Sequence, residues 1–259
     1  MRKMPFHLVD PSPWPFLLSM NLMALVMQFI FYVNFKKTII MFCLFNLLVV
    51  IFFWSRDITR EGSYLGFHNK KIRKNMKLGM VFFILSEIMF FFGIFWSLLH
   101  SSLSFCIDFF NTWPPKGISI INPFGIPLLN TVLLLLSGYT ITVSHFSLLK
   151  KDFFFSSSHL LLTIFLGLLF IMIQFMEYKS SFFCFNNSIY GCCFFISTGF
   201  HGLHVLLGLL LLCVCFVRML SGHFTNDKHV LFECSIWYWH FVDVVWVFLY
   251  LMLYCWISL

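Results

Sequence analysis

The sequence predicts an all-α, polytopic membrane protein with seven transmembrane helices. Of its 259 residues, 60% are hydrophobic and only 10% are charged, whereas soluble domains carry about 25% charged residues. Aromatic residues make up 21%, which also excludes a disordered chain. Runs of apolar residues are long enough to cross a bilayer as helices, which takes about 20 residues. Barrel strands would alternate apolar and polar residues, and these runs do not alternate.

Charged residues, prolines and glycines divide the chain into the expected helices. The first segment follows the prolines that end at Pro15, and the second ends at Trp54, before Arg56. A basic connector, residues 55–75, precedes the third segment. Nothing before residue 15 resembles a cleaved signal peptide. The seven expected segments are residues 16–33, 38–54, 76–99, 127–149, 155–176, 190–218 and 234–256.

Charged residues, prolines and glycines also set the boundaries of the remaining segments. A long connector, residues 100–126, separates the third and fourth segments, and Lys150 and Lys151 end the fourth. Within the fifth, residues 160–176 carry only three interruptions of the apolar run, and none of them is charged. The sixth segment ends at Arg218, and a polar stretch that contains Lys228 separates it from the seventh. No internal repeat indicates the inverted halves of a secondary transporter.

Basic residues are distributed unequally between the two sides of the expected membrane. Thirteen of the 17 Lys and Arg residues lie on the N-terminal side, so the N-terminus is expected to face the negative compartment and the C-terminus the opposite one. The net charge of +7 favours contact with anionic lipid head groups rather than nucleic acid. Nine cysteines without a C-x-x-C motif indicate neither a disulfide framework nor a thiolate metal site.

Ionisable residues at membrane depth are the candidate functional residues, because such groups are costly in the bilayer and face the bundle interior. Glu87 lies near the middle of the third segment and needs a partner from another helix. Helical spacing places polar residues on one stripe of the sixth segment and on one stripe of the seventh. A buried polar cluster is therefore expected from Glu87, His201, His204, His240 and Asp243.

Three interpretations of this expected cluster remain open. It could bind a metal, although the Glu-x-x-His motif of di-iron bundles is absent. It could relay protons through the desolvated Glu87. The interpretation that we favour is a polar contact that locks the third, sixth and seventh helices together. Ser137, Thr140 and Ser144 form a similar stripe in the fourth segment and predict interhelical contacts.

Two runs in the last third of the chain carry a specific resemblance. Residues 201–205 read HGLHV, and residues 237–246 read WYWHFVDVVW with three tryptophans, a histidine and an aspartate. Together they resemble cytochrome c oxidase subunit III of the mitochondrial type. Further collinear matches are VDPSPWP at residues 9–15, Arg56-Asp57 with Arg60-Glu61, Ser86-Glu87, HSSL at 100–103, WPP at 113–115, PLLNT at 127–131 and TGF at 198–200.

The resemblance implies a two-helix pair and a five-helix bundle with a lipid-filled cleft. The expected division is residues 1–75, with the first two helices and the basic loop, and residues 76–259, the bundle. It implies a non-redox subunit that docks on subunit I, among other complex IV subunits, and carries no haem or copper itself. The partner subunits would hold those cofactors and reduce oxygen with electrons from cytochrome c while protons are pumped. The alternative is a stand-alone proton-coupled transporter.

The resemblance also implies a location and a lipid site. The chain would cross the mitochondrial inner membrane, with its N-terminus in the matrix and its C-terminus in the intermembrane space. Phospholipid head groups would contact Arg60, Glu61, His68 and Arg218. The chain departs from the family pattern at Ser55, where the family has a second tryptophan, at Asn69, where it has proline, and near His7, where it has several histidines.

Overall fold

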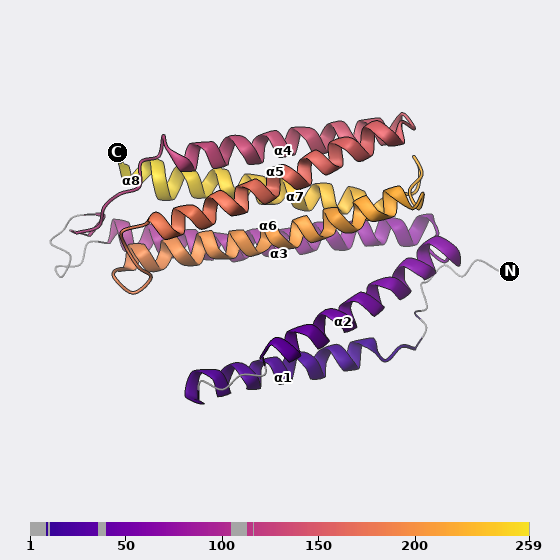
Figure 1. Ribbon diagram of the computed structural model, residues 1–259, viewed down its shortest axis with the longest axis horizontal. Coiled ribbons are helices and arrows are strands. Elements are labelled where there is room, and N and C mark those ends of the chain that lie inside the picture. Colours follow the sequence, from indigo (N-terminus) through magenta and orange to yellow (C-terminus); the bar gives the residue numbers. More distant parts are fainter. Residues whose placement is uncertain (1–8, 10, 36–39, 105–112, 116, 259) are drawn as a thin grey trace. The chain divides into compact units, whose positions relative to one another are not determined.

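The computed structural model describes residues 9, 11–35, 40–104, 113–115 and 117–258 (Figure 1). Every named element in this part of the chain is helical. The chain divides into two compact units, Met1–Met76 and Lys77–Leu259, and each is described by itself. His7 and five of the basic residues counted for the orientation lie outside the described residues; the five are Arg2, Lys3, Lys36, Lys37 and Lys116.

The first unit contains an antiparallel helix pair, α1 (Trp14–Phe35) and α2 (Ile40–Thr59). Trp14 at the start of α1 joins the end of α2: its Nε1 donates to Asp57 Oδ2 at 2.7 Å, and its ring stacks on Phe53 with centroids 5.6 Å apart. α2 continues directly into a short π-helix, η1 (Arg60–Tyr64). Arg56, Asp57, Arg60 and Glu61, the charged residues of the resemblance in this region, therefore lie at one end of α2.

α3 (Lys70–Leu103) begins six residues before the expected position. Asn69 explains the difference, because its Oδ1 accepts hydrogen bonds from the backbone N–H groups of Lys71 and Ile72 at 3.0 and 3.1 Å. Such a cap satisfies N–H groups that a helix start leaves unpaired. Four basic residues of the expected connector, Lys70, Lys71, Arg73 and Lys74, therefore lie in the first turns of a helix.

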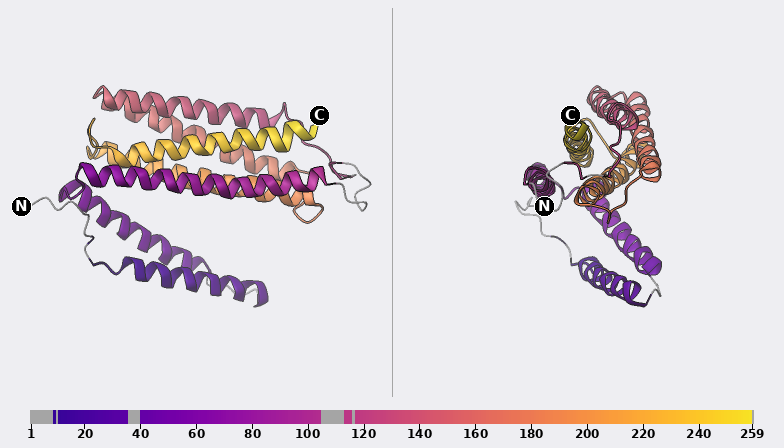
Figure 2. Two further views of the ribbon diagram at one scale, coloured as in Figure 1. Left: turned by 180° about the vertical axis from the view of Figure 1, so that it is seen from behind. Right: turned by 90° about the vertical axis from the view of Figure 1, so that its left-hand side faces the viewer.

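The second unit continues with α4 (Ile126–Leu149), α5 (Phe153–Ser180), α6 (Ile189–Leu220) and α7 (Val230–Leu249). A π-helix η3 (Tyr250–Cys255) and a last turn α8 (Trp256–Ser258) extend α7. These helices and the second-unit part of α3 lie side by side as a bundle (Figures 1 and 2). Asp152 caps α5 and Ser188 caps α6, each by accepting a backbone N–H.

Seven helices in the described part of the chain are long and apolar enough to span a membrane. This confirms the predicted fold class and the predicted number of spans. Many large apolar side chains point outward and remain exposed, for example Phe154 at 85% and Met41 at 79%. Such an exterior is suited to lipid or to neighbouring subunits rather than to water.

Small residues allow the helices of the second unit to approach closely. Ser144 on α4 and Ser156 on α5 exchange hydrogen bonds, each hydroxyl donating to the other residue's carbonyl at 2.8 Å. One turn away, Thr140 and Thr163 join their hydroxyl groups at 2.8 Å. These contacts confirm that the predicted polar stripe on α4 lies between helices, as expected when small polar residues repeat at helical spacing.

Candidate functional site

Three of the expected head-group residues lie on one compact turn of the first unit. Arg60 and Glu61 open the π-helix η1, and His68 follows it. The imidazole of His68 packs against the turn at Gly62, where a Cβ atom would lie only 2.8 Å from His68 Nδ1. Glycine at this position therefore lets the His68 ring approach the backbone beside Arg60 and Glu61.

Arg218 lies in the last turn of α6, in the second unit. Its guanidinium carbon stands 5.0 Å from the centre of the Phe224 ring, a distance typical of a cation–π contact. Arginine at a helix C-terminus also interacts favourably with the negative end of the helix dipole. Two local interactions thus orient this cation at the end of an apolar helix.

Glu87 and His204 form a hydrogen-bonded pair between α3 and α6. His204 Nε2 and Glu87 Oε2 are 2.9 Å apart, and the two side chains are 12% and 22% exposed. Phe91 on α3 contacts the imidazole with ring centroids 5.1 Å apart. This partner on the sixth segment is the kind that the sequence predicted for Glu87.

The hydrogen bonds of His204 show where one proton must be. Its Nδ1 lies 2.7 Å from the carbonyl oxygen of Phe200, and a carbonyl can only accept, so Nδ1 carries a hydrogen. The bond between Nε2 and Glu87 Oε2 then needs a second proton. Either the imidazole is cationic beside a carboxylate, or it is neutral beside a carboxylic acid. Both states leave the pair with no net charge, which lowers the cost of its burial.

His201 lies one turn before His204 but faces a different part of the core. It is 1% exposed, and its Nε2 donates to the carbonyl oxygen of Val242 at 3.2 Å. Its ring packs on Trp246, with centroids 5.1 Å apart, and edge-on against Phe170. His201 therefore connects α6 with α5 and α7 rather than with Glu87.

Asp243 and His240 are also placed apart from Glu87. Asp243 Oδ2 lies 3.8 Å from His240 Nδ1, and it occupies the space that a Cβ on Gly138 of α4 would need, at 2.6 Å. Within the described residues, no hydrogen bond or ion pair joins Asp243 to Glu87 or His204. The single cluster expected from the sequence is thus divided among three places: Glu87 with His204, His201, and Asp243 with His240.

Helical geometry explains this division. Because each residue turns by about 100°, residues three apart on a helix, such as His201 and His204, differ by about 60° in direction, and residues two apart, such as Phe241 and Asp243, differ by about 160°. On α7, Tyr238 and Phe241 contact the His204 ring, with centroids 6.3 Å away in each case. Asp243 points instead toward α4. A shared stripe and a shared depth therefore do not ensure a shared neighbour.

Sequence reasoning missed a further buried acid, Glu177 on α5. It is 2% exposed, and its Oε1 accepts a 2.7 Å hydrogen bond from the hydroxyl of Tyr254. One turn earlier, Gln174 Oε1 accepts from Asn130 Nδ2 of α4 at 3.1 Å. Glu177 stands near a helix end beside Lys179, where a charge usually faces the interface. The i, i+3 spacing of Gln174 and Glu177 was the available signal.

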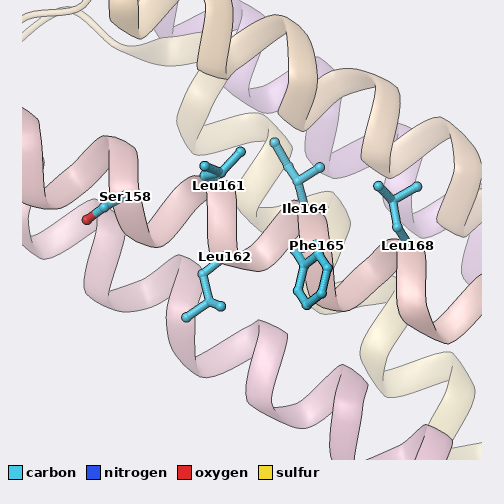
Figure 3. Close-up of a pocket in the computed structure, with 6 residues that line it drawn as sticks. All are labelled: Ser158, Leu161, Leu162, Ile164, Phe165 and Leu168. Carbon is cyan, nitrogen blue, oxygen red and sulfur yellow. The ribbon is translucent and has the colours of Figure 1, made fainter.

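α5 also carries a hollow with a volume of about 460 Å³ (Figure 3). Its lining is almost entirely apolar, and every lining residue belongs to α5. Such a surface fits a hydrocarbon chain or an apolar side chain better than a polar substrate. The lining residues are Ser158, Leu161, Leu162, Ile164, Phe165 and Leu168.

Comparisons with known proteins cover nearly the whole chain. The family model described as cytochrome c oxidase subunit III matches residues 4–258. The cytochrome c oxidase subunit 3 of Pelomedusa subrufa is 46% identical over 253 residues, and that of Drosophila melanogaster is 45% identical over 254; both alignments cover 97% of each chain. That of Chondrus crispus is 45% identical over 262 residues, covering 99% of this chain and 95% of its own. The chain therefore belongs to the cytochrome c oxidase subunit III family.

Proposed function

We propose that this subunit of cytochrome c oxidase stabilises subunit I and holds phospholipid, while the haem and copper of partner subunits carry out the redox chemistry. In this proposal the chain lies in the mitochondrial inner membrane, with its N-terminus in the matrix and its C-terminus in the intermembrane space. The asymmetry of Lys and Arg supports this orientation. Residues 1–75 and 76–259 would form the two parts of the subunit.

The placement of cations at the ends of apolar helices carries the lipid part of the proposal. Arg60 follows α2, His68 precedes α3, and Arg218 lies in the last turn of α6. Cationic side chains near a membrane surface favour lipid phosphates, at about 1 kcal/mol each. Glu61 would complement an amine in a zwitterionic head group. The apolar exterior of the helices suits the acyl chains.

Arg218→Ala is expected to lower the phospholipid retained by the purified oxidase complex and to shorten its lifetime during turnover. Loss of one cation corresponds to roughly fivefold weaker binding of the contacted lipid. Lipid phosphorus per complex, with activity followed over time, measures both effects. Lys228→Ala is the matched control, because Lys228 is an exposed cation in the connector that follows α6. Equal lipid content in the two variants would contradict the assignment of Arg218.

For the Glu87–His204 pair, we propose a structural role as a contact between α3 and α6. Glu87→Gln is expected to leave assembly and most oxygen reduction intact, because the amide can still hydrogen-bond to His204 Nε2. Glu87→Leu removes the partner of His204 and should destabilise the subunit by about 1–3 kcal/mol. Oxygen consumption and the amount of assembled complex test both variants. Lost turnover of Glu87→Gln at normal assembly would instead support an obligatory proton relay.

A further inference from the structure

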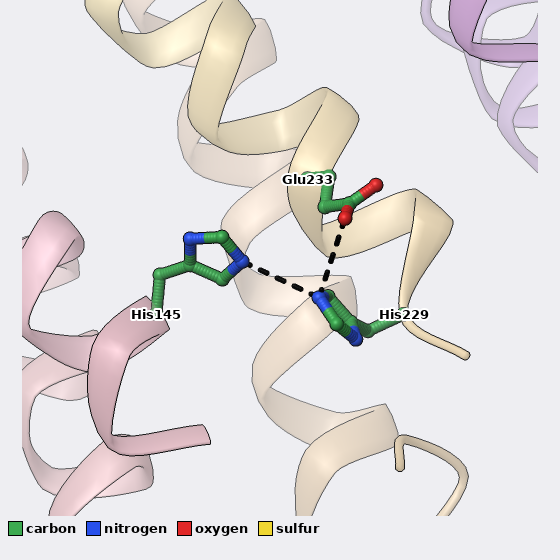
Figure 4. Close-up of side chains that lie close together, drawn as sticks. All are labelled: His145, His229 and Glu233. Atoms are coloured by element: carbon green, nitrogen blue, oxygen red, sulfur yellow. Dashed lines mark hydrogen bonds and ion pairs between the residues drawn. The ribbon is translucent and has the colours of Figure 1, made fainter. Parts of the chain in front are cut away.

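Two histidines and a glutamate meet at one end of the second unit (Figure 4). His145 lies near the C-terminal end of α4, His229 immediately precedes α7, and Glu233 lies in the first turn of α7. His229 is 5% exposed, His145 is half-buried, and the side chain of Glu233 is 21% exposed. Among the described residues, one ligand atom from each of the three lies within 4.8 Å of the other two.

The ligand atoms of these residues approach one another closely. His145 Nε2 lies 3.3 Å from His229 Nε2, and His229 Nε2 lies 3.4 Å from Glu233 Oε1 (Figure 4). The other ring nitrogen of His229, Nδ1, donates to the carbonyl oxygen of Thr225 at 2.9 Å. In a neutral imidazole, Nε2 then presents a lone pair to both of its neighbours.

One hydrogen cannot serve both contacts of His229 Nε2, the one with His145 and the one with Glu233. A hydrogen on either histidine can bridge the two Nε2 atoms, or a hydrogen on His229 Nε2 can point at Glu233, but one hydrogen aligns well with only one of the two contacts. The 3.4 Å between His229 Nε2 and Glu233 Oε1 is also longer than an ordinary N–H···O hydrogen bond, which spans about 2.7–3.2 Å. The arrangement therefore brings three potential ligand atoms close together, one from each side chain.

The two distances match the edges of a zinc coordination tetrahedron. With Zn–N and Zn–O bonds of about 2.0–2.1 Å, neighbouring ligand atoms are about 3.3 Å apart. Zinc sites commonly combine two histidines, one carboxylate and a water molecule. A metal-ligating histidine usually donates its other N–H to a backbone carbonyl or a carboxylate, as His229 does to Thr225. We propose that His145, His229 and Glu233 bind a divalent transition-metal ion, with Zn²⁺ preferred.

The ammonium group of Lys77 competes with a bound metal ion for the carboxylate of Glu233. Its Nζ forms an ion pair with Oε2 of Glu233, the carboxylate oxygen that is not directed at His229. The ion pair holds the carboxylate in place but also puts a positive charge beside the expected cation, and like charges repel. Lys77→Met is therefore expected to strengthen zinc binding severalfold. A purely structural histidine pair would give no such increase.

The test measures zinc uptake by the intact oxidase complex, because this chain exists as one of its subunits. Complexes are treated with a chelator and equilibrated by dialysis with radioactive Zn²⁺ alone. The unmodified complex should bind one equivalent more than complexes carrying His145→Gln or Glu233→Gln. Removing one ligand should weaken this site by at least about 100-fold, since loss of an outer hydrogen-bond partner alone costs 10–100-fold.

His159→Gln is the matched control. His159 lies on α5, and its Nδ1 donates to the carbonyl oxygen of Phe155 within the same helix. This variant should bind zinc like the unmodified complex. X-ray absorption of the additional zinc should show two imidazole ligands. Equal uptake by the unmodified, His145→Gln and Glu233→Gln complexes would overturn the proposal, as would weaker binding by Lys77→Met. If His145→Gln fails to assemble, Glu233→Gln and Lys77→Met decide the question.

Discussion

Trp239→Ala is expected to destabilise this subunit by about 3–5 kcal/mol, the usual cost of removing a fully buried large aromatic side chain. The indole is 0% exposed and fills the space between α5 and α6, where both helices carry glycine. Its Nε1 also donates to Ser137 Oγ on α4 at 2.9 Å. The substitution therefore removes packing against three helices at once. The temperature at which the subunit dissociates from the detergent-solubilised oxidase complex measures the loss.

Trp237→Ala is the control, because it removes the same side chain two residues away on the same helix. Trp237 is 38% exposed, so its truncation should cost far less. Comparable dissociation temperatures for the two variants would show that the packing around Trp239 is not the source of stability. A normal dissociation temperature for Trp239→Ala would contradict the prediction outright.

Gly167→Val is expected to reduce stable assembly of the subunit. A Cβ at this position of α5 would lie 2.7 Å from Leu209 Cδ2 and 2.8 Å from Trp239 Cη2. The indole cannot move away easily, because it is already enclosed by α4 and α6. Overpacking of this kind typically costs about 1–3 kcal/mol and at times more. The yield of oxidase complex containing this subunit is the measurement.

Gly199→Val tests whether the loss comes from helix propensity alone. Gly199 lies inside α6, and a Cβ there meets nothing within 4 Å in this chain. The same β-branched residue is introduced into a helix in both variants, so its intrinsic cost is matched. Equal yields for Gly167→Val and Gly199→Val would attribute the effect to the valine itself and would refute the close approach at Gly167.

Sequence reasoning could identify a partner for Glu87, but it could not identify the neighbour of Asp243. A lone acid in the middle of an apolar segment needs a partner from another helix, and the histidines of the sixth segment were the available candidates. The structure gives it His204, at 2.9 Å. Asp243 occupies a comparable depth, but depth along a helix says nothing about which neighbour a side chain faces. That depends on the rotation of α7, which directs Asp243 toward Gly138.

The group formed by His145, His229 and Glu233 illustrates the same limit. The i, i+4 spacing of His229 and Glu233 places these two on one helical face, and the sequence shows this spacing. His145 joins them across 84 residues, so only the packing of α4 beside α7 reveals the third member. Glu177 was missed for a related reason, since its partner Tyr254 lies 77 residues away.

The sequence by itself determined the fold class, the seven spans, the family and the need of Glu87 for a partner from another helix. These follow from composition, from the length of apolar runs and from local motifs, because the bilayer imposes its thickness and its polarity on each segment separately. Only the tertiary structure decided which polar groups meet. Helix-to-helix approach is set by small residues such as Gly167 and Gly208 and by the rotation of each helix about its axis, and neither the closeness nor the rotation is encoded in any single segment.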